Sequence, residues 1–473
     1  MKNVSISLKM LGVALALSVG VVKAQVTDSA AAPATPVAVV VVPTPVPVIK
    51  ADDFKPSGHL WGYTFGDAFY KAHSDSMSRG GSNQYSGVPG NNIQGGGKAA
   101  FQFRRIYLGY TADISKKFTA ELLLEAADNF AAGNPPANGT VTTGTAGSGD
   151  ELSNGKLSFY IKLANLRWKN IWKGTDLVVG QVYTPSFAML TEKIWSYRSV
   201  ERTIADIRRT PSYDMGVTLQ GKFDAKGNYG YNVMVGNGTS AKPASNNFRS
   251  FYGDVYAKFL NQHLVFDLYA DYTRENWTKT WHHSRQMLKG FVAYTTPKLT
   301  VGVEGFINNL QKDLFATKTA GGAVDTLNNA ATGLAIFVHG NIIKEKLRFF
   351  ARVDFYNPMT KVNNSIYKGY AANTGNYNDN SFKTTVTTVN GVVNTTYAST
   401  GDETYKQTFV TAGLDYSPAK NVHFMPNIWF ENYTSQLPGL TGKVKSDYDL
   451  VYRMTFYYIF GKSGRIANET FQP

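Results

Sequence analysis

The stretch Tyr213-Asp214-Met215-Gly216-Val217-Thr218-Leu219-Gln220-Gly221-Lys222-Phe223 decides the fold class of this chain. Its odd-numbered positions hold Tyr, Met, Val, Leu, Gly and Phe, whereas its even-numbered positions hold Asp, Gly, Thr, Gln and Lys. Side chains on a β-strand alternate between two faces, so this strand has one apolar face and one polar face. A soluble β-sandwich shows the same alternation. The number, length and spacing of such segments must therefore distinguish the two.

About 16 segments of this kind follow one another along the chain. We expect strands near 57–70, 99–112, 117–128, 156–168, 175–184, 211–224, 227–237, 249–260, 263–274, 285–297, 299–309, 332–343, 346–357, 404–418, 421–434 and 445–461. The connections alternate between tight turns, such as 225–226 and 344–345, and long loops. The long loops are 71–98, 129–155, 185–210, 310–331 and 358–403. Tight turns at one end and long loops at the other are typical of outer-membrane barrels.

An even number of strands lets the first and last strands pair antiparallel, which leaves no sheet edge in contact with lipid. The sequence therefore predicts an all-β protein, a closed antiparallel transmembrane β-barrel of about 16 strands. Its short turns and both termini are expected in the periplasm, and its long loops outside the cell. Small barrels are filled by their own side chains, whereas barrels of about 16–18 strands leave an aqueous channel.

The N-terminus has the pattern of an export signal. Lys2 and Lys9 supply positive charge, an apolar run extends over 10–22, and Ala24 ends a small-residue cleavage site. This run is short for a membrane-spanning helix, although a signal anchor remains an alternative. We predict a signal peptide over 1–24 and export to the outer membrane of a Gram-negative bacterium.

The next segment, 25–56, is rich in Ala, Pro and Val. Recurrent proline cannot join a central strand and favours an extended spacer. We predict a periplasmic linker over 25–56, with docking of a partner as the alternative, and the outer-membrane barrel over 57–473.

Composition excludes several classes of protein. Cysteine is absent, which rules out a thiol nucleophile, a disulfide and a lipoprotein anchor. The 28 Tyr and 28 Phe residues suit strands and the aromatic girdles of membrane barrels. The formal net charge of +14 favours an anionic partner, and export argues against nucleic acid. The expected partners are membrane lipid and small hydrophilic or anionic solutes.

Four motifs lie in order between Leu177 and Gly238. They are Val179-Gly180-Gln181-Val182-Tyr183-Thr184-Pro185-Ser186-Phe187, Ser199-Val200-Glu201-Arg202, the strand 214–223, and Gly230-Tyr231-Asn232-Val233-Met234-Val235-Gly236-Asn237-Gly238. With these motifs, and with 103–109 and 118–125 upstream, the chain resembles the phosphate-selective porin O and P family. The resemblance implies a trimeric, 16-stranded porin whose third loop folds inward and whose solute path is lined by basic residues in anion-specific members. The C-terminus departs from many such barrels, because a tail to Pro473 follows the aromatic residue Phe460.

The third long loop carries the candidate pore constriction. Its basic residues are Lys193, Arg198, Arg202, Arg208 and Arg209, against the acidic Glu192, Glu201 and Asp206. Guanidinium groups bind phosphate and carboxylate as a fork, and rings of charge set selectivity in narrow pores. A second interpretation is equally open: these arginines pair with acids of the loop or hold the loop to the wall.

The barrel wall favours a mixed lumen. Alternation places seven basic residues inward, namely Arg104, Lys162, Lys222, Lys258, Arg348, Arg352 and Arg453. It also places eleven acidic residues inward, namely Glu121, Glu125, Asp214, Asp254, Asp267, Asp271, Glu304, Asp354, Asp415, Glu431 and Asp449. Arg104, Lys222, Arg348, Arg352 and Arg453 are the wall residues that we expect along the solute path. The excess positive charge of the chain therefore lies in loops and turns. A bulge shifts the alternation by one residue, so it could reverse which face any single residue in this count occupies.

No pattern of catalytic, cofactor-binding or metal-binding residues stands out. The adjacent His282 and His283 lack a Glu-x-x-His pattern, and Gly95–Gly97 lack the ending of a phosphate-binding loop. We predict a non-enzymatic porin without cofactor or metal, which passes small hydrophilic solutes with a weak anion or phosphate preference. The alternative is a non-conducting surface receptor or adhesin, and the length of the loop 358–403 is the feature that would support it.

Overall fold

The computed structural model describes most of the barrel region. The described residues are 54–76, 79, 99–127, 159–208, 212–244, 247–277, 282–318, 323–367, 369–372, 382–389, 392–399 and 405–461. The predicted signal peptide and nearly all of the predicted linker lie outside these residues. Among the residues described, no helix is long and apolar enough to cross a membrane.

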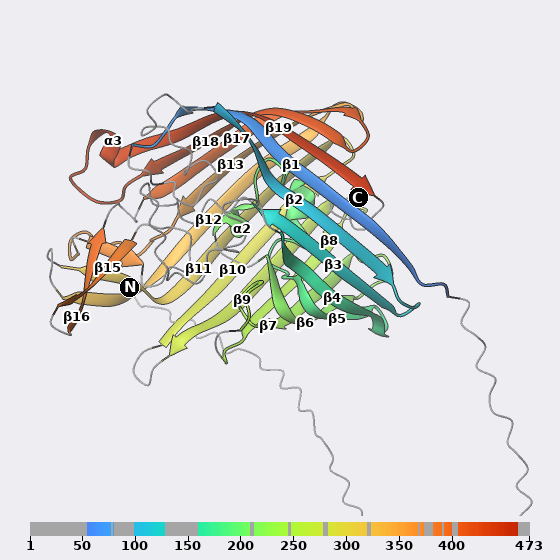
Figure 1. Cartoon of the computed structure of the whole chain (residues 1–473), viewed down its shortest axis with the longest axis horizontal. Helices are drawn as coiled ribbons and strands as arrows, with labels where there is room; N and C mark the ends of the chain where they lie inside the picture. The colour runs from blue at the N-terminus through green and yellow to red at the C-terminus, as the bar shows by residue number, and fades with distance from the viewer. Residues whose placement is uncertain are drawn as a thin grey trace, which may run out of the picture. The chain divides into compact units, whose positions relative to one another are not determined.

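Sixteen antiparallel strands form a closed barrel, as the alternation predicted. They are β1 (Ser57–His73), β2 (Ala99–Asp113), β3 (Phe118–Ala127), β4 (Phe159–Trp172), β5 (Thr175–Tyr183), β6 (Tyr213–Lys222), β7 (Tyr229–Gly236), β8 (Ser250–Phe259), β9 (Leu264–Trp277), β10 (His282–Thr295), β11 (Leu299–Thr317), β12 (Val324–Ile343), β13 (Leu347–Asn357), β17 (Lys406–Ala419), β18 (Val422–Thr434) and β19 (Ser446–Gly461). Each strand pairs with the next, and β13 pairs with β17. The last strand, β19, returns to β1 with Trp61 opposite Gly461, which closes the ring (Figure 1).

The remaining elements lie in the loops. The helices α1 (Thr191–Trp195) and α2 (Ile204–Arg208) belong to the third long loop, and α3 (Gly442–Lys445) precedes β19. The long connection between β13 and β17, predicted as loop, contains β14 (Gly369–Ala372), β15 (Phe382–Val389) and β16 (Val392–Ser399). The first of these pairs with the end of β11, and the other two pair with each other.

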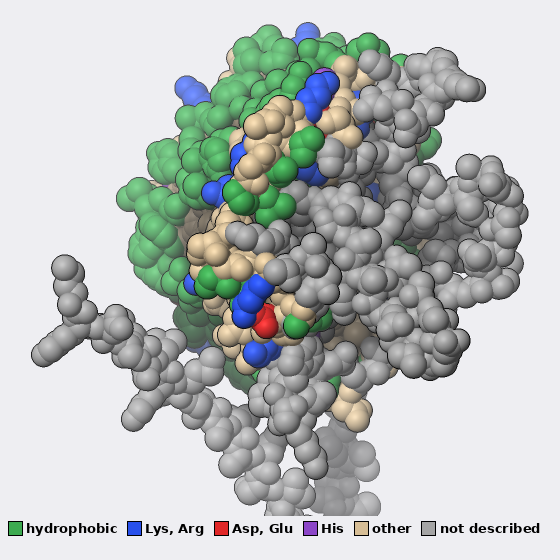
Figure 2. Space-filling model, turned by 90° about the vertical axis from the view of Figure 1, so that its left-hand side faces the viewer, with side chains coloured by type: hydrophobic (Ala, Val, Ile, Leu, Met, Phe, Trp, Pro, Cys, Tyr) green, Lys and Arg blue, Asp and Glu red, His purple; other side chains and the backbone are tan. Residues whose placement is uncertain are grey.

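The two faces of each strand differ as the sequence predicted. On β6, Asp214 and Thr218 are buried inside the barrel, whereas Met215 and Val217 are 42% and 45% exposed on the outside. Hydrophobic side chains cover much of the outer wall that Figure 2 shows. An apolar exterior and a more polar interior are what lipid and lumen require.

β-Bulges or irregularities interrupt this alternation in several strand pairs, and two of the bulges involve basic residues. Between β1 and β2, Phe65 is opposite Arg105 and Gly66 is opposite Phe103, so Arg104 is the extra residue. Between β3 and β4, Lys162 is the extra residue in the same way. A bulge lets two consecutive side chains point to the same face. Both Arg104 and Arg105 therefore point inward, where sequence alternation could place only one of them.

Candidate functional site

The third long loop lies inside the barrel and crosses the lumen. It leaves the wall after β5 and returns at β6, but its polar atoms bind distant strands. Arg104 of β2 donates to the carbonyl oxygens of Ser199 and Val200, the latter at 3.2 Å. Lys289 of β10 donates to Thr191 Oγ1 at 3.1 Å. These contacts confirm the inward-folding loop that the resemblance implied.

Contacts with β12, β13 and β18 complete this attachment. The carbonyl oxygen of Ile194 accepts from His339 Nε2 on β12 at 2.9 Å. Arg352 of β13 donates to the carbonyl oxygen of Arg202, and Trp429 Nε1 of β18 donates to Glu201 Oε2 at 3.0 Å. The loop is therefore held to opposite parts of the ring.

Aromatic packing fixes the middle of the loop. Trp195 is fully buried, and its ring lies 5.2 Å from that of Phe337 on β12. The ring of Tyr197 lies 4.5 Å from that of Phe350 on β13. The indole N–H of Trp195 donates to the carbonyl oxygen of Glu201 at 2.8 Å, which ties the two ends of this segment together. The loop and the wall thus share one buried apolar cluster.

The predicted basic residues of the loop have different surroundings. Arg198 Nη1 pairs with Glu192 and, at 2.7 Å, with Asp206 Oδ2. Nitrogen atoms of Arg202 lie 3.9 Å from Glu201 Oε1 and 3.9 Å from Asp206 Oδ1. Both arginines therefore have the acidic partners that the second interpretation expected.

The other predicted loop residues are only partly accounted for. Lys193 and Arg198 both border a cavity of the lumen. Arg208 is the last residue of α2, but its side chain and the whole of Arg209 lie outside the described residues.

Burial and neighbouring charges shift the pKa of two loop carboxyls in opposite directions. Burial raises the pKa of Glu192 above its usual value, and the effect of the nearby Asp206 charge adds to it, while Arg198 opposes both. Burial alone would also raise the pKa of Glu201. The guanidinium groups of Arg202 and Arg104 and the Trp429 hydrogen bond instead lower the pKa of Glu201 below its usual value. Glu201 is therefore held as a carboxylate where the loop meets the wall.

All five predicted wall residues point into the barrel. Arg104 Nε lies 2.6 Å from Asp67 Oδ2, Arg352 pairs with Asp354, and Arg453 Nε donates to Asn427 Oδ1 at 2.7 Å. The guanidinium of Arg348 lies 5.4 Å from the ring centre of Tyr197, and Lys222 borders the cavity.

Sequence reasoning missed several inward cations, among them Arg105 and Lys289, and also Arg167 and Lys169, which line the lumen. Arg105 turns inward because of the bulge and pairs with Glu125 at 2.9 Å. Lys289 pairs with Asp267 at 2.8 Å, but its neighbours on the inward face of β10 are the apolar Met287, Phe291 and Ala293, so alternation gave little sign of a polar face there.

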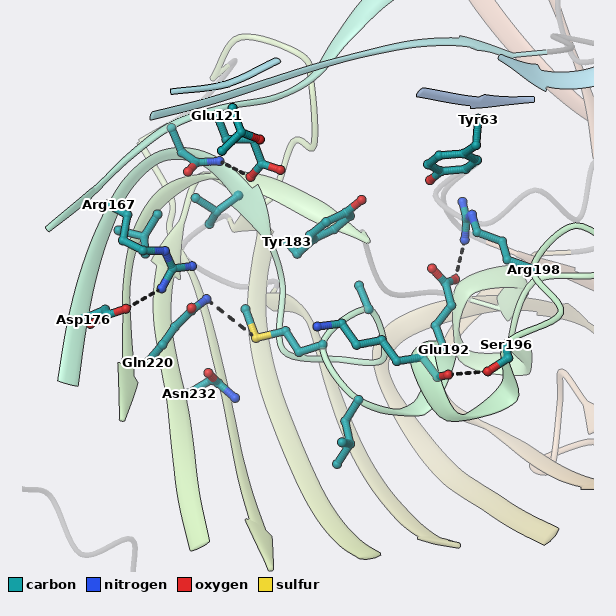
Figure 3. Close-up of a pocket in the computed structure, with 18 of the residues that line it drawn as sticks. Tyr63, Glu121, Arg167, Asp176, Tyr183, Glu192, Ser196, Arg198, Gln220 and Asn232 are labelled. Atoms are coloured by element: carbon teal, nitrogen blue, oxygen red, sulfur yellow. Dashed lines mark hydrogen bonds and ion pairs between the residues drawn. The ribbon is translucent and has the colours of Figure 1, made fainter. Parts of the chain in front are cut away.

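A cavity of about 940 Å³ occupies the part of the lumen between the loop and the tight-turn end of the barrel (Figure 3). Its seven basic lining residues are Arg167, Lys169, Lys193, Arg198, Lys222, Lys258 and Arg348. Its six acidic lining residues are Asp113, Glu121, Asp176, Glu192, Asp254 and Asp415. Two ion pairs, Arg167–Asp176 at 2.9 Å and Lys169–Asp113 at 3.3 Å, lie near the turns. The lumen is therefore mixed in charge, as the wall residues predicted.

Comparison with solved structures agrees with this architecture. The chain is similar to the outer membrane channel DcaP of Acinetobacter baumannii, at 12% identity and a TM-score of 0.50, over 86% of this chain and 97% of that chain. It is also similar to an anion-selective porin from Comamonas acidovorans, at 10% identity and a TM-score of 0.48, over 86% and 100% of the two chains. The chain is similar to OmpF of Salmonella typhi at 11% identity and a TM-score of 0.47, over 85% of this chain and 97% of that chain.

No family model and no curated protein matches the sequence. Membership of the phosphate-selective porin O and P family therefore stays a prediction, since likeness at such low identity shows the fold alone. The closed 16-stranded ring, the loop inside it and the likeness to DcaP together show that this chain has the fold of a bacterial outer-membrane porin.

Proposed function

We propose that this protein is an outer-membrane porin of a Gram-negative bacterium, through which small hydrophilic solutes diffuse passively. The observation that carries the proposal is a charged cavity inside a closed barrel, bordered by a loop that crosses the lumen. A water-filled lumen lined by charged side chains is the common feature of barrels that conduct. We also propose a homotrimer and export by the signal peptide, on the basis of the sequence.

The proposal includes a weak preference for anions. Arg198 and Lys193 border the cavity from the loop that crosses the lumen, and charges inside a lumen are screened less than charges in open water. Their effect is moderated by Glu192 and Asp206, which pair with Arg198. A strong selectivity is therefore not expected. Phosphate is one anion that such a lumen would pass, and preference for it over other anions rests on the family resemblance.

Planar-bilayer recording tests the proposal. The purified protein should insert and give discrete conductance steps in KCl, with a small reversal potential of the sign for anions in a salt gradient. The variant Lys117→Gln is the control, because Lys117 is exposed in the turn between β2 and β3. Replacement of Lys117 should leave the reversal potential unchanged.

A receptor or adhesin is the second candidate. It is favoured by the extent of packing at the level of the loop, where inward apolar side chains of several strands surround Ile204. A protein that inserts, shifts on a gel after boiling and still gives no conductance step would establish this candidate and overturn the porin.

A further inference from the structure

One side of the cavity is an aromatic wall, by which we mean Tyr63 and Phe65 of β1, Tyr183 of β5 and Tyr457 of β19. All four side chains line the cavity. The ring of Tyr457 lies 6.2 Å from that of Tyr63 and 6.3 Å from that of Phe65, in both cases edge to face. Behind them, Tyr107 stacks on Tyr63 at 4.3 Å. A lumen that serves only as a water channel is polar, so these rings need another explanation.

Packing of the loop does not supply this explanation for the β1 residues. Among the described residues, Tyr63 and Phe65 cluster with wall residues and with Tyr183 and Tyr213 at the loop ends. The buried residues of the loop centre, among them Trp195, cluster instead with Phe337 and Phe350 across the lumen. Tyr63 and Phe65 are 4% and 3% exposed, so each presents only a small part of its ring to the cavity, and the half-buried Tyr183 and Tyr457 present more of the wall.

A guanidinium edge lies beside this wall. Figure 3 shows Tyr63 of β1 next to the Arg198 side chain, with Tyr183 close by. Both ion pairs of Arg198 use Nη1. Within the described residues, Nε and Nη2 of Arg198 make no hydrogen bond, and the residue lines the cavity. Two parallel N–H donors of this kind match the two oxygens of a carboxylate.

We propose that the cavity binds an organic anion that carries a ring, such as an aromatic carboxylate. The carboxylate accepts hydrogen bonds from Nε and Nη2 of Arg198, and the ring packs against the aromatic wall. This inference rests on the proposed function, because the solute must enter the barrel from water. It goes further by naming the class of solute for which the channel has a site.

The size and lining of the cavity agree with this class. Sites for small organic ligands typically enclose about 300–1,000 Å³ and are lined by aromatic side chains with a few polar groups. The cavity has about 940 Å³ and holds both kinds of group. A phosphate ion would use the guanidinium edge and gain nothing from the rings. A ring without an acid group would leave the guanidinium edge unpaired.

The experiment compares benzoate with acetate as blockers of the reconstituted channel at pH 7 and constant ionic strength. Both anions carry one carboxylate, and only benzoate has a ring. Benzoate should reduce the mean current and raise current noise at millimolar concentration, whereas acetate should do neither. Tyr63→Leu keeps an apolar side chain without the ring, and it should raise the half-blocking benzoate concentration about three- to tenfold. Arg198→Gln should raise that concentration about tenfold or more.

The matched control is Tyr256→Leu. Tyr256 also lines the cavity, but it belongs to β8, which is far from β1 around the ring. This control should leave the block by benzoate unchanged. Equal effects of benzoate and acetate, or an unchanged half-blocking concentration in Tyr63→Leu, would overturn the proposal. If Tyr63→Leu does not fold, Tyr183→Leu takes its place.

Failure of the porin proposal gives a different result. A protein that never conducts cannot be blocked, so binding of benzoate to the detergent-folded protein is then measured by equilibrium dialysis. Binding that weakens in Tyr63→Leu and not in Tyr256→Leu would support the site in a non-conducting barrel. Absence of binding there would overturn it.

Discussion

Trp195→Ala should release the loop from the wall without unfolding the barrel. The side chain is fully buried, its ring lies 5.2 Å from Phe337 and 6.5 Å from Phe350, and the guanidinium carbon of Arg352 lies 5.3 Å from the ring centre. Truncation of a buried tryptophan costs about 3–5 kcal/mol. The strand pairs are unaffected, since every lost contact joins the loop to the wall or to itself.

The lost free energy therefore destabilises the docked position of the loop and not the barrel. A change of about 3–5 kcal/mol lowers the ratio of docked to released loop roughly 100- to 5,000-fold. Single-channel recording should show a steady wild-type current and, in Trp195→Ala, frequent transitions between conductance levels. The gel shift on boiling should be the same for both proteins, because the closed ring remains.

Two variants control this experiment. Trp195→Phe retains a ring at the same position and should give an intermediate noise level. Trp168→Ala removes a tryptophan that is 43% exposed on the outside of β4, and it should conduct as steadily as wild type. If Trp195→Ala is as steady as Trp168→Ala, then the aromatic packing does not hold the loop, and the polar contacts with Arg104 and Arg352 must suffice.

Three further predictions concern charge. The double variant Arg198→Gln/Arg202→Gln should shift the reversal potential toward cations at 0.1 M salt. The shift should shrink at 1 M salt, because the Debye length falls from about 10 Å to about 3 Å. An unchanged reversal potential at low salt would show that these arginines do not set the selectivity. The lowered pKa of Glu201 means that its ionic contribution to loop docking is complete above the ordinary value of 4.5 and is lost as pH falls below it. Current noise should therefore rise in acid in the wild type and rise less in Glu201→Gln, in which Glu192 still titrates. Arg104→Ala leaves the buried Asp67 without its guanidinium and should destabilise the folded barrel by about 3–5 kcal/mol in urea titration; the reasoning fails if adding Asp67→Asn restores none of this loss.

The barrel could be predicted because most strands obey alternation. On β6 the facings from Asp214 to Thr218 followed from the period of two, and the neighbouring connections showed which end holds the turns. The period is a weak guide where the inward face is itself largely apolar, as at Met287, Phe291 and Ala293 of β10, which is why Lys289 was missed. The period of two assigns residues to the wrong face beyond a bulge, because the register changes there by one residue. The strands β14, β15 and β16 were missed because their segments lie within a long polar connection.

The candidate site was predictable in composition and not in contacts. The basic residues of the third loop are evident from the sequence, but their partners depend on how the loop crosses the lumen. Arg198 pairs with Glu192 within the loop itself. Trp429, which binds Glu201, is more than 200 residues away in the sequence, so this contact depends on how distant segments pack. The aromatic wall was also missed, because Tyr and Phe fit equally well in a membrane girdle and inside a lumen.

The bulge at Arg104 has a consequence for how such a wall can change in evolution. Gln102 and Arg104 point inward, Phe103 is exposed on the outside, and Arg105 points inward again. Removal of Arg104 would place Phe103 directly before Arg105 and restore a regular ladder, with no other side chain exchanged between lipid and lumen. A one-residue insertion at such a position can therefore add charge to the pore while the hydrophobic belt stays intact. Relatives that differ in this way lose alignment within a strand while they keep the same fold.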